Sequence, residues 1–250
     1  MRGVTIGPRA VAAGEPVFLV AEIGINHNGA LAVAERLIAA AAAAGCDAVK
    51  FQKRTIEAVY TTAELAQLRD SPFGRTNGDL KRGLEFGHAE YRAIDRACRD
   101  AGLLWFASCW DERALHFIEA FDPPCHKIAS ACLTDHALLR RHRDSARPLL
   151  LSTGMSTLEQ IDAAVQVLGR EALVLMHCTS TYPSPVEELN LRAIPKLPER
   201  HRVPVGYSGD EVGLSTTVAA VSLGAVVVER HLTLDRAMWG SDQAASIEPD

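Results

Sequence analysis

The stretch FLVAEIGINHNG at residues 18–29 decides how the rest of the chain is interpreted. It opens in an apolar run, residues 17–21, which is typical of a strand buried on both faces. Glu22 stands at the carboxyl end of this strand, and a turn at 27–29 leads directly into an expected helix. A strand that ends in a carboxylate and turns into a helix is typical of α/β enzymes, whose sites lie at the carboxyl ends of strands.

The alternation of strand and helix continues along the whole chain. Strands are expected at 17–25, 48–53, 103–108, 125–129, 148–153, 172–178, 203–208 and 225–232. Helices are expected at 31–44, 89–101, 112–120, 135–141, 157–168, 189–197 and 215–223. This pattern predicts a (β/α)8 TIM barrel, preceded by a hairpin at 4–16. Few residues follow the last strand, so the eighth helix is expected to be incomplete.

An open, doubly wound sheet is the alternative fold. It is the weaker prediction, because no GxGxxG motif follows the first strand. The longest interruption of the alternation, residues 55–87, mixes polar and apolar residues. We expect it to form a loop with a short helix that acts as a lid over the strand ends.

Length and composition place the chain among globular proteins. Its 250 residues suit one barrel domain spanning 1–250, and 48% of them are hydrophobic. The net charge of −5 argues against a nucleic-acid partner but leaves room for an anionic substrate. The apolar runs are too short for a membrane span, and the N-terminus does not read as a signal peptide. The six cysteines form no CxxC pair, which predicts reduced thiols in a cytoplasmic protein.

Two lysines enter otherwise apolar strands near their carboxyl ends. Lys50 lies in AVKFQK and Lys127 in HKIAS. A lysine in a buried strand is costly unless it meets an anion. Hydroxyl residues end several of the other strands, and lysines with short hydroxyl donors suit a phosphate group. The alternative for each hydroxyl residue is that it merely caps the following helix.

Acidic and imidazole side chains also gather at the expected strand ends. Such groups suit acid–base chemistry or an ion such as Mn²⁺ or Mg²⁺, rather than a thiolate metal site. The spacing is weak support by itself, because no two of them form an HxH or HxxxH pair. These candidates are Glu22, His27, His177, Asp210, Glu211, Glu229 and His231.

A set of motifs in fixed order resembles the sialic acid synthase family. The segments are AEIGINHNG, AVKFQKR, HKIAS, LLSTGMST, LMHCTSTYPSP, GYSG, ERHLTLD and GSDQAASIEP, and together they cover about residues 4–249. The resemblance implies a barrel that condenses phosphoenolpyruvate with an N-acetylated amino-sugar aldehyde. The family includes N-acetylneuraminate synthases and the related 9-phosphate, legionaminate and pseudaminate synthases.

The resemblance also implies roles for individual residues. Glu22, Lys50, Lys127 and Asp242 are the implied catalytic residues, with Glu22 handling protons and Asp242 positioning the sugar. His231 and Asp210 are the implied ligands of Mn²⁺ or Mg²⁺. Among the implied substrate-binding residues, Gln52 is expected to contact the sugar, and the others are expected to bind phosphoenolpyruvate. The implied substrate-binding residues are Gln52, Ser108, Ser130, Ser152, Ser180, Tyr182 and Ser208.

This chain departs from the family pattern at several points. Asp210 stands where members usually carry a second metal-binding histidine, and Ser180 stands where some carry asparagine. A carboxylate can still bind Mn²⁺ or Mg²⁺. The C-terminal antifreeze-like domain common in the family is expected to be absent from 1–250.

The resemblance predicts a cytoplasmic homodimer that condenses phosphoenolpyruvate with N-acetylmannosamine or its 6-phosphate. The product would be a sialic acid or its 9-phosphate, with release of phosphate. Three alternatives stay open: a synthase for legionaminate or pseudaminate, a related aldolase-like synthase for 3-deoxy sugars, and a catalytically weak barrel that binds sugar or phosphoenolpyruvate as a regulator. The change at Asp210 is the feature that favours the regulator.

Overall fold

Eight parallel strands close into a barrel in the computed structural model, which describes residues 3–249. Around the ring the strands run β10-β11-β12-β3-β4-β7-β8-β9, so chain order is kept. The closed ring confirms the predicted (β/α)8 barrel and is incompatible with an open sheet. The barrel strands are β3 (Phe18–Gly24), β4 (Ala48–Lys53), β7 (Leu104–Cys109), β8 (His126–Ile128), β9 (Leu149–Ser152), β10 (Leu173–Cys178), β11 (Val205–Gly209) and β12 (Val227–His231).

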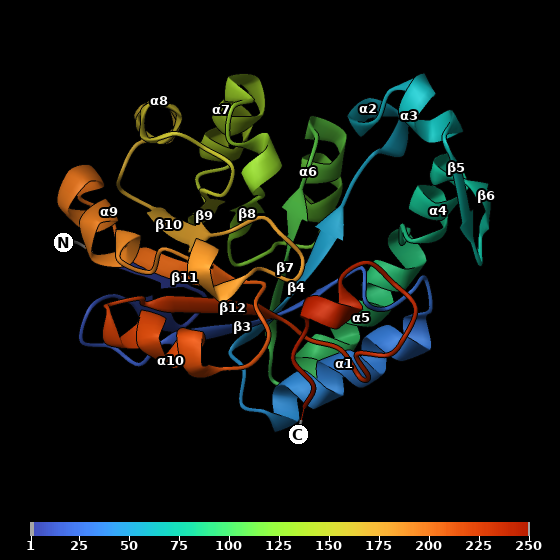
Figure 1. Ribbon diagram of the computed structural model, residues 1–250, viewed down its shortest axis with the longest axis horizontal. Coiled ribbons are helices and arrows are strands. Elements are labelled where there is room, and N and C mark those ends of the chain that lie inside the picture. The colour runs from blue at the N-terminus through green and yellow to red at the C-terminus, as the bar shows by residue number, and fades with distance from the viewer. Residues whose placement is uncertain (1–2, 250) are drawn as a thin grey trace.

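Helices surround the barrel strands, one after each strand from β3 to β11 (Figure 1). Within residues 3–249 no α-helix follows β12, and only the short 3₁₀ turn η3 (Gln243–Ala245) forms there, as expected for an incomplete eighth helix. No helix of the described chain is both long and apolar enough to cross a membrane. The surrounding helices are α1 (Leu31–Ala43), α5 (His88–Asp100), α6 (Glu112–Glu119), α7 (His136–Asp144), α8 (Leu158–Leu168), α9 (Ala193–His201) and α10 (Ser215–Ser222).

The helices form where apolar spacing and capping residues predict them, with one shift. Thr157 accepts a hydrogen bond from the Gln160 amide and completes a capping box at the start of α8. The helix expected at 189–197 instead forms as α9, four residues later. Asn190 has a positive φ of 42°, and the 3₁₀ turn η2 (Val186–Glu188) precedes it, so a continuous helix cannot begin there.

The N-terminal hairpin closes the bottom of the barrel. It pairs β1 (Val4–Ile6) with β2 (Arg9–Val11), as predicted. Its apolar side chains join one hydrophobic cluster with inward-facing strand residues such as Val20 and Phe106. The lower half of the barrel is therefore a packed core, which leaves the upper, carboxyl end for polar groups.

The insert between β4 and α5 is more ordered than predicted. It contains α2 (Ile56–Val59), α3 (Thr62–Ala66), an antiparallel hairpin of β5 (Leu68–Ser71) and β6 (Gly74–Thr76), and α4 (Asn77–Gly83). The expected loop with one short helix is therefore wrong. Capping boxes at Thr61–Glu64 and Thr76–Asp79 stabilise these elements, which are too short to show a clear hydrophobic period.

Candidate active site

The inner face of the barrel changes from apolar to polar along each strand. Val20 on β3 is followed two residues later by Glu22, and Ala48 on β4 by Lys50. Because side chains alternate across a strand, both members of each pair point into the barrel. The strand register then places these polar groups at one level, since Glu22 pairs with His231 on one side and with Lys50 on the other.

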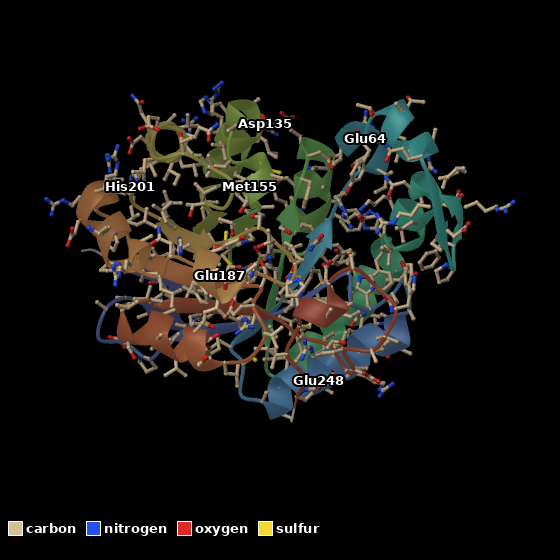
Figure 2. All side chains as sticks on the ribbon, in the orientation of Figure 1. Glu64, Asp135, Met155, Glu187, His201 and Glu248 are labelled. Carbon is tan, nitrogen blue, oxygen red and sulfur yellow. The ribbon has the colours of Figure 1, made fainter. Side chains whose placement is uncertain are left out.

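A cavity of about 210 Å³ opens among these polar groups at the carboxyl ends of the strands. No residue of the insert lines it, so the expected lid does not border this cavity. Met155, which Figure 2 labels, follows β9 and borders the cavity with 72% of its surface exposed. The residues predicted for the site that line it are Glu22, Lys50, Gln52, Ser108, Lys127, Ser130, Ser152, Ser180, Tyr182, Ser208, Asp210 and His231.

Glu229 occupies the centre of the charged cluster. Its Oε1 atom lies 2.9 Å from Lys50 Nζ and 3.4 Å from Lys127 Nζ, and it accepts a hydrogen bond of 3.0 Å from the Ser208 hydroxyl. Lys50 Nζ also lies 3.3 Å from Glu22 Oε2. The two ammonium groups therefore converge on one carboxylate oxygen, and Glu22 and Glu229 together balance their charge.

Burial and neighbouring charges set the protonation of this cluster. Burial raises the pKa of Glu22, and Lys50 offsets the rise only in part. Burial acts on Glu229 in the same direction, but Lys127 and Lys50 together lower the pKa of Glu229 to about 2. Burial would lower the pKa of Lys50, yet the two glutamates raise it. Burial, aided by repulsion from Lys50, lowers the pKa of Lys127. Of the two carboxyls in this cluster, Glu22 is the one whose pKa is raised, which makes it the better candidate to exchange a proton.

Hydroxyl and backbone donors line the wall beside Lys127. Lys127 Nζ donates a hydrogen bond of 2.7 Å to the Ser152 hydroxyl. Farther along this wall, the Gly154 amide donates to Ser130 Oγ at 3.0 Å and to Cys178 Sγ at 3.2 Å. Ammonium groups, hydroxyls and backbone amides are the donors that bind phosphate oxygens in proteins.

Gly154 is required for this arrangement. A Cβ atom at position 154 would collide with the hydroxyl of Ser180 and lie 2.9 Å from the hydroxyl of Ser130. Because glycine has no Cβ atom, the backbone at position 154 can lie close to the hydroxyls that line the cavity.

Asp210 and His231 face each other across the rim of the cavity. Asp210 Oδ1 lies 3.6 Å from His231 Nε2, and burial raises the pKa of Asp210 to about 6, although His231 opposes the rise. A carboxylate and an imidazole fit Mn²⁺ or a similar ion. Among residues 3–249 no set of three His, Cys, Asp or Glu side chains is arranged to hold a metal. Oxygen atoms of substrate or water would have to complete the coordination of an ion bound here.

A buried ion pair holds these two facing residues in place. Arg230 Nη1 lies 3.1 Å from Glu211 Oε1, and the Tyr207 hydroxyl donates to Glu211 Oε2 at 2.8 Å. Glu211 directly follows Asp210, and Arg230 directly precedes His231. The pair therefore connects the ends of β11 and β12 and fixes the spacing of the two facing side chains.

Several candidates from the sequence lie outside the central cavity. His27 stacks on Phe86 at 4.0 Å between ring centroids, and burial lowers the pKa of His27 to about 3. His177 Nε2 lies 2.7 Å from the carbonyl oxygen of Leu189. Glu211 belongs to the ion pair just described. These three side chains have structural partners rather than positions in the cavity.

Asp242 also lies outside the residues that line the cavity. Its Oδ1 atom accepts a hydrogen bond of 2.6 Å from the Ser241 hydroxyl. Burial, Asp210 and Asp242 together raise the pKa of Tyr182, a residue that does line the cavity. Asp242 therefore stands beside the mouth rather than within it.

Glu229 is the main residue of the cavity that is absent from the predicted site. The sequence placed it only among candidates for metal binding or acid–base chemistry and left it out of the predicted site. Alternation along β12 puts Glu229 on the same face as His231, so the signal was available. Cys178 also lines the cavity, and the amide of Gly154 donates a hydrogen bond to it. No sequence pattern predicts either position, because a hydrogen bond from a backbone amide to a side chain far away in sequence depends on tertiary packing.

Comparison with known proteins gives a consistent set of matches. The model of the NeuB family matches residues 37–250. The N-acetylneuraminate-9-phosphate synthases of Drosophila melanogaster and Homo sapiens are 39% and 38% identical over 241 and 246 residues, or 94% and 96% of this chain. The chain spans about two thirds of these relatives, 65% and 68% of their lengths.

A solved structure extends the likeness to three dimensions. The N-acetylneuraminic acid synthetase of Leptospira borgpetersenii serovar Hardjo-bovis, solved in complex with citrate, is 31% identical with a TM-score of 0.88. The match covers 99% of this chain and 84% of that chain.

Proposed function

Since the chain belongs to the NeuB family, we propose that its barrel condenses phosphoenolpyruvate with an N-acetylated amino-sugar aldehyde. The acceptor is N-acetylmannosamine or its 6-phosphate, and the products are a sialic acid or its 9-phosphate and inorganic phosphate. The enzyme is thus a transferase that forms a carbon–carbon bond.

The observation that carries this proposal is the convergence of Lys50 and Lys127. Both ammonium groups are buried, and both lie within 3.4 Å of Glu229 Oε1. A second anion is needed to use the remaining donors of Lys127 and Ser152, and the phosphate of phosphoenolpyruvate supplies it. The lysines and hydroxyls therefore orient one substrate with its reactive carbon toward Glu22 and His231.

The reaction follows from that placement. C3 of phosphoenolpyruvate attacks the aldehyde carbon of the open-chain sugar, and the aldehyde oxygen takes up a proton. Water adds to C2, and the phosphate leaves with its bridging oxygen by C–O cleavage. Glu22 is placed to transfer the protons that these steps require, while Asp242 positions the sugar at the mouth. Most of the rate enhancement comes from orientation and fixed charge.

A divalent ion belongs to the same proposal. His231 and Asp210 would hold Mn²⁺ or Mg²⁺, and such an ion would supply Lewis-acid polarisation of the aldehyde oxygen. No group of residues 3–249 forms a hydrogen bond with the buried Nδ1 atom of His231, so the orientation of the ring is set by packing against Tyr182, whose ring centroid lies 5.7 Å away. The ion pair of Arg230 and Glu211 keeps the two ligands facing each other.

The test is phosphate release from phosphoenolpyruvate in the presence of Mn²⁺ and a panel of acceptors. The panel contains N-acetylmannosamine, its 6-phosphate, and the sugar precursors of legionaminate and pseudaminate. Lys127→Ala should lower turnover by roughly 10³-fold or more, because a buried cation that touches substrate is lost. Lys127→Met, which keeps the bulk of the side chain, should lose as much. Lys196→Ala, on the exposed face of α9, is the control and should keep full activity.

A catalytically weak barrel that binds sugar or phosphoenolpyruvate as a regulator remains the alternative. It is favoured by the presence of Asp210 where family members usually carry a metal-binding histidine. If wild type and Asp210→His both bind phosphoenolpyruvate and sugar but neither releases phosphate, the barrel is a binding protein. Turnover by wild type excludes that alternative. Turnover only with aldehydes of 3-deoxy-sugar synthases would instead assign the chain to that related reaction.

The assembly and location of the protein stay predictions. The family resemblance predicts a homodimer, which sedimentation of the purified chain measures directly. It also predicts a cytoplasmic protein, in agreement with six cysteines that form no disulfide within the described residues.

A further inference from the structure

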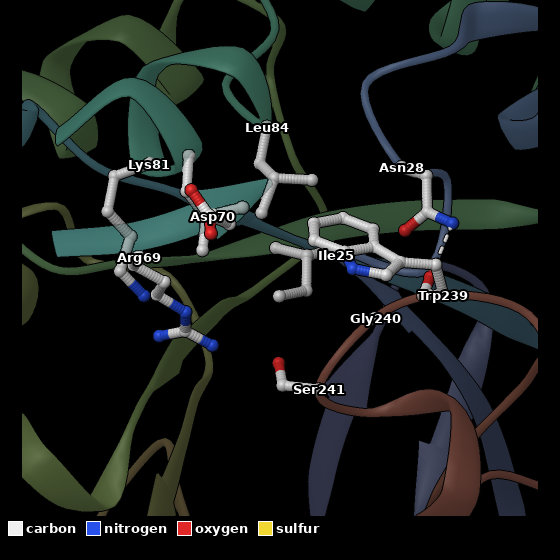
Figure 3. Close-up of a pocket in the computed structure, with 10 residues that line it drawn as sticks. Ile25, Asn28, Arg69, Asp70, Lys81, Leu84, Trp239, Gly240 and Ser241 are labelled. Carbon is white, nitrogen blue, oxygen red and sulfur yellow. Dashed lines mark hydrogen bonds between the residues drawn. The ribbon is translucent and has the colours of Figure 1, made fainter. Parts of the chain in front are cut away.

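A second cavity of about 260 Å³ lies beside the catalytic one. Figure 3 shows Arg69, Asp70 and Lys81 from the insert on one side and Asn28 and Trp239 on the other. Leu84 and Ile25 form an apolar wall, and the hydroxyl of Ser241 points into the space between the two sides. The cavity thus combines two cations, an aromatic ring and polar groups.

Close backbone contacts hold the insert against this part of the barrel. A Cβ atom at Gly29 would collide with the carbonyl oxygen of Gly83, so the turn after β3 and the end of α4 touch directly. The ring of Phe73, at the tip of the β5–β6 hairpin, packs against these glycines and makes an edge contact with Trp239 at 6.4 Å between centroids. The positions of β5 and α4, and of the cations on them, are therefore fixed relative to the barrel mouth.

The segment that runs from β3 into the following turn contributes residues to both cavities. Ile25 of the second cavity is three residues from Glu22 of the first, so their Cα atoms are at most about 11 Å apart. Asn28 Nδ2 donates a hydrogen bond of 2.7 Å to the carbonyl oxygen of Trp239, which ties the turn after β3 to the C-terminal segment. The separation between Glu22 and Ile25 is comparable to the length of an extended six-carbon sugar that carries a terminal phosphate.

The two cations of this cavity lack acidic partners. Arg82 of the same insert pairs with Glu57 at 2.9 Å, whereas no ion pair of the described residues includes Arg69 or Lys81. Lys81 Nζ lies over the ring of Tyr60 at 5.2 Å, a contact that leaves its charge uncompensated. Among the described residues Asp70 is the one carboxylate that lines the cavity, so this lining carries a net positive charge.

We propose that this second cavity binds the far end of the acceptor sugar, and that Arg69 and Lys81 select an acceptor with a terminal phosphate. The inference rests on the proposed condensation and goes further, because it commits the chain to a phosphorylated acceptor and names the residues that recognise it. A dianionic phosphate ester balances the two cations, and the indole ring of Trp239 offers a flat surface for the carbon chain of the sugar. An unphosphorylated sugar leaves both cations without a partner.

The test compares N-acetylmannosamine 6-phosphate with N-acetylmannosamine as acceptors for several variants. Wild type should favour the phosphorylated acceptor in kcat/KM. Arg69→Ala and Lys81→Ala should each raise the KM for that acceptor about tenfold, and the double variant about a hundredfold, because each removes a charge-assisted contact. The KM for N-acetylmannosamine and for phosphoenolpyruvate should not change. Asp70→Asn should lower the KM for the phosphorylated acceptor, because it removes a repelling charge.

A control variant separates local contacts from general charge. Arg75→Ala removes a cation from β6 of the same insert, outside the cavity lining, and should leave both acceptors unaffected. Equal effects of Arg69→Ala on the two acceptors, or a wild-type preference for the unphosphorylated sugar, would overturn the inference. If no acceptor supports phosphate release, the condensation itself fails. Calorimetric binding of the phosphorylated sugar to wild type and to the double variant then decides on the subsite alone, and equal affinities would refute it.

Discussion

Replacing Glu229 by glutamine removes the carboxylate on which two buried lysines converge. Glu229 Oε1 lies 2.9 Å from Lys50 Nζ and 3.4 Å from Lys127 Nζ, and Glu229 is only 4% exposed. Glu229→Gln keeps the size of the side chain and its contact with Ser208 but removes the charge. Two ammonium groups then share Glu22 as their remaining acidic neighbour, and their mutual repulsion is less compensated.

The size of the effect follows from the pKa of Glu229. Although burial opposes ionisation, the lysines lower this pKa from 4.5 to about 2, which corresponds to about 3 kcal/mol of folding free energy at neutral pH. Because the pKa is lower in the folded state, the contribution is complete above pH 4.5 and is lost as the pH falls through 2. A loss of about 3 kcal/mol in a chain of this size lowers Tm by roughly 6–12 °C.

Urea and thermal unfolding at pH 7 measure this loss. Glu112→Gln is the control, because Glu112 is 59% exposed and pairs with Arg141 at 3.8 Å on the surface. It should change the free energy of unfolding by less than about 0.5 kcal/mol. Phosphoenolpyruvate should stabilise Glu229→Gln more than wild type, because its negative charge replaces the missing carboxylate. A Glu229→Gln protein as stable as the control, or one that gains nothing extra from phosphoenolpyruvate, would refute the role assigned to Glu229.

Two further predictions concern buried groups outside the cavity lining. Arg230→Met should destabilise the protein by about 3–5 kcal/mol, because it leaves Glu211 buried and unpaired. Adding Glu211→Gln should restore part of the loss in urea unfolding, whereas strictly additive losses would contradict the ion pair. His126 and His142 are fully buried, their four ring nitrogens lack hydrogen bonds within residues 3–249, and burial lowers their pKa values to about 3 and about 4. The neutral rings therefore contribute stability above pH 6.5 that is lost as the pH falls toward 4, by up to about 1.4 kcal/mol per pH unit for each ring. His142→Leu should therefore flatten the pH dependence of the free energy of unfolding in urea. His136→Ala, at an exposed position, is the control and should leave that pH dependence unchanged.

The fold could be predicted from the sequence because it depends on local patterns. Buried parallel strands appear as continuous apolar runs, and the helices between them carry their own caps, so all eight barrel strands and seven helices were identified. The insert at 55–87 was misjudged for the converse reason. Its elements have three to seven residues, too few to show a period, and they are held by contacts such as Phe73 against Gly29 that connect distant segments.

The sequence by itself determined which polar residues stand at the strand ends, because the side-chain alternation of a strand is a local property. Lys50, Lys127 and Glu22 could therefore be assigned to one mouth once a barrel was expected. Only the tertiary structure decided how these charges are shared, with Glu229 between the lysines and Asp242 beside the mouth. The tertiary structure alone also placed Arg69 and Lys81 across a cavity from Trp239. Distances between charges depend on strand register and on how the insert packs against the barrel, and no local stretch of sequence determines either of these.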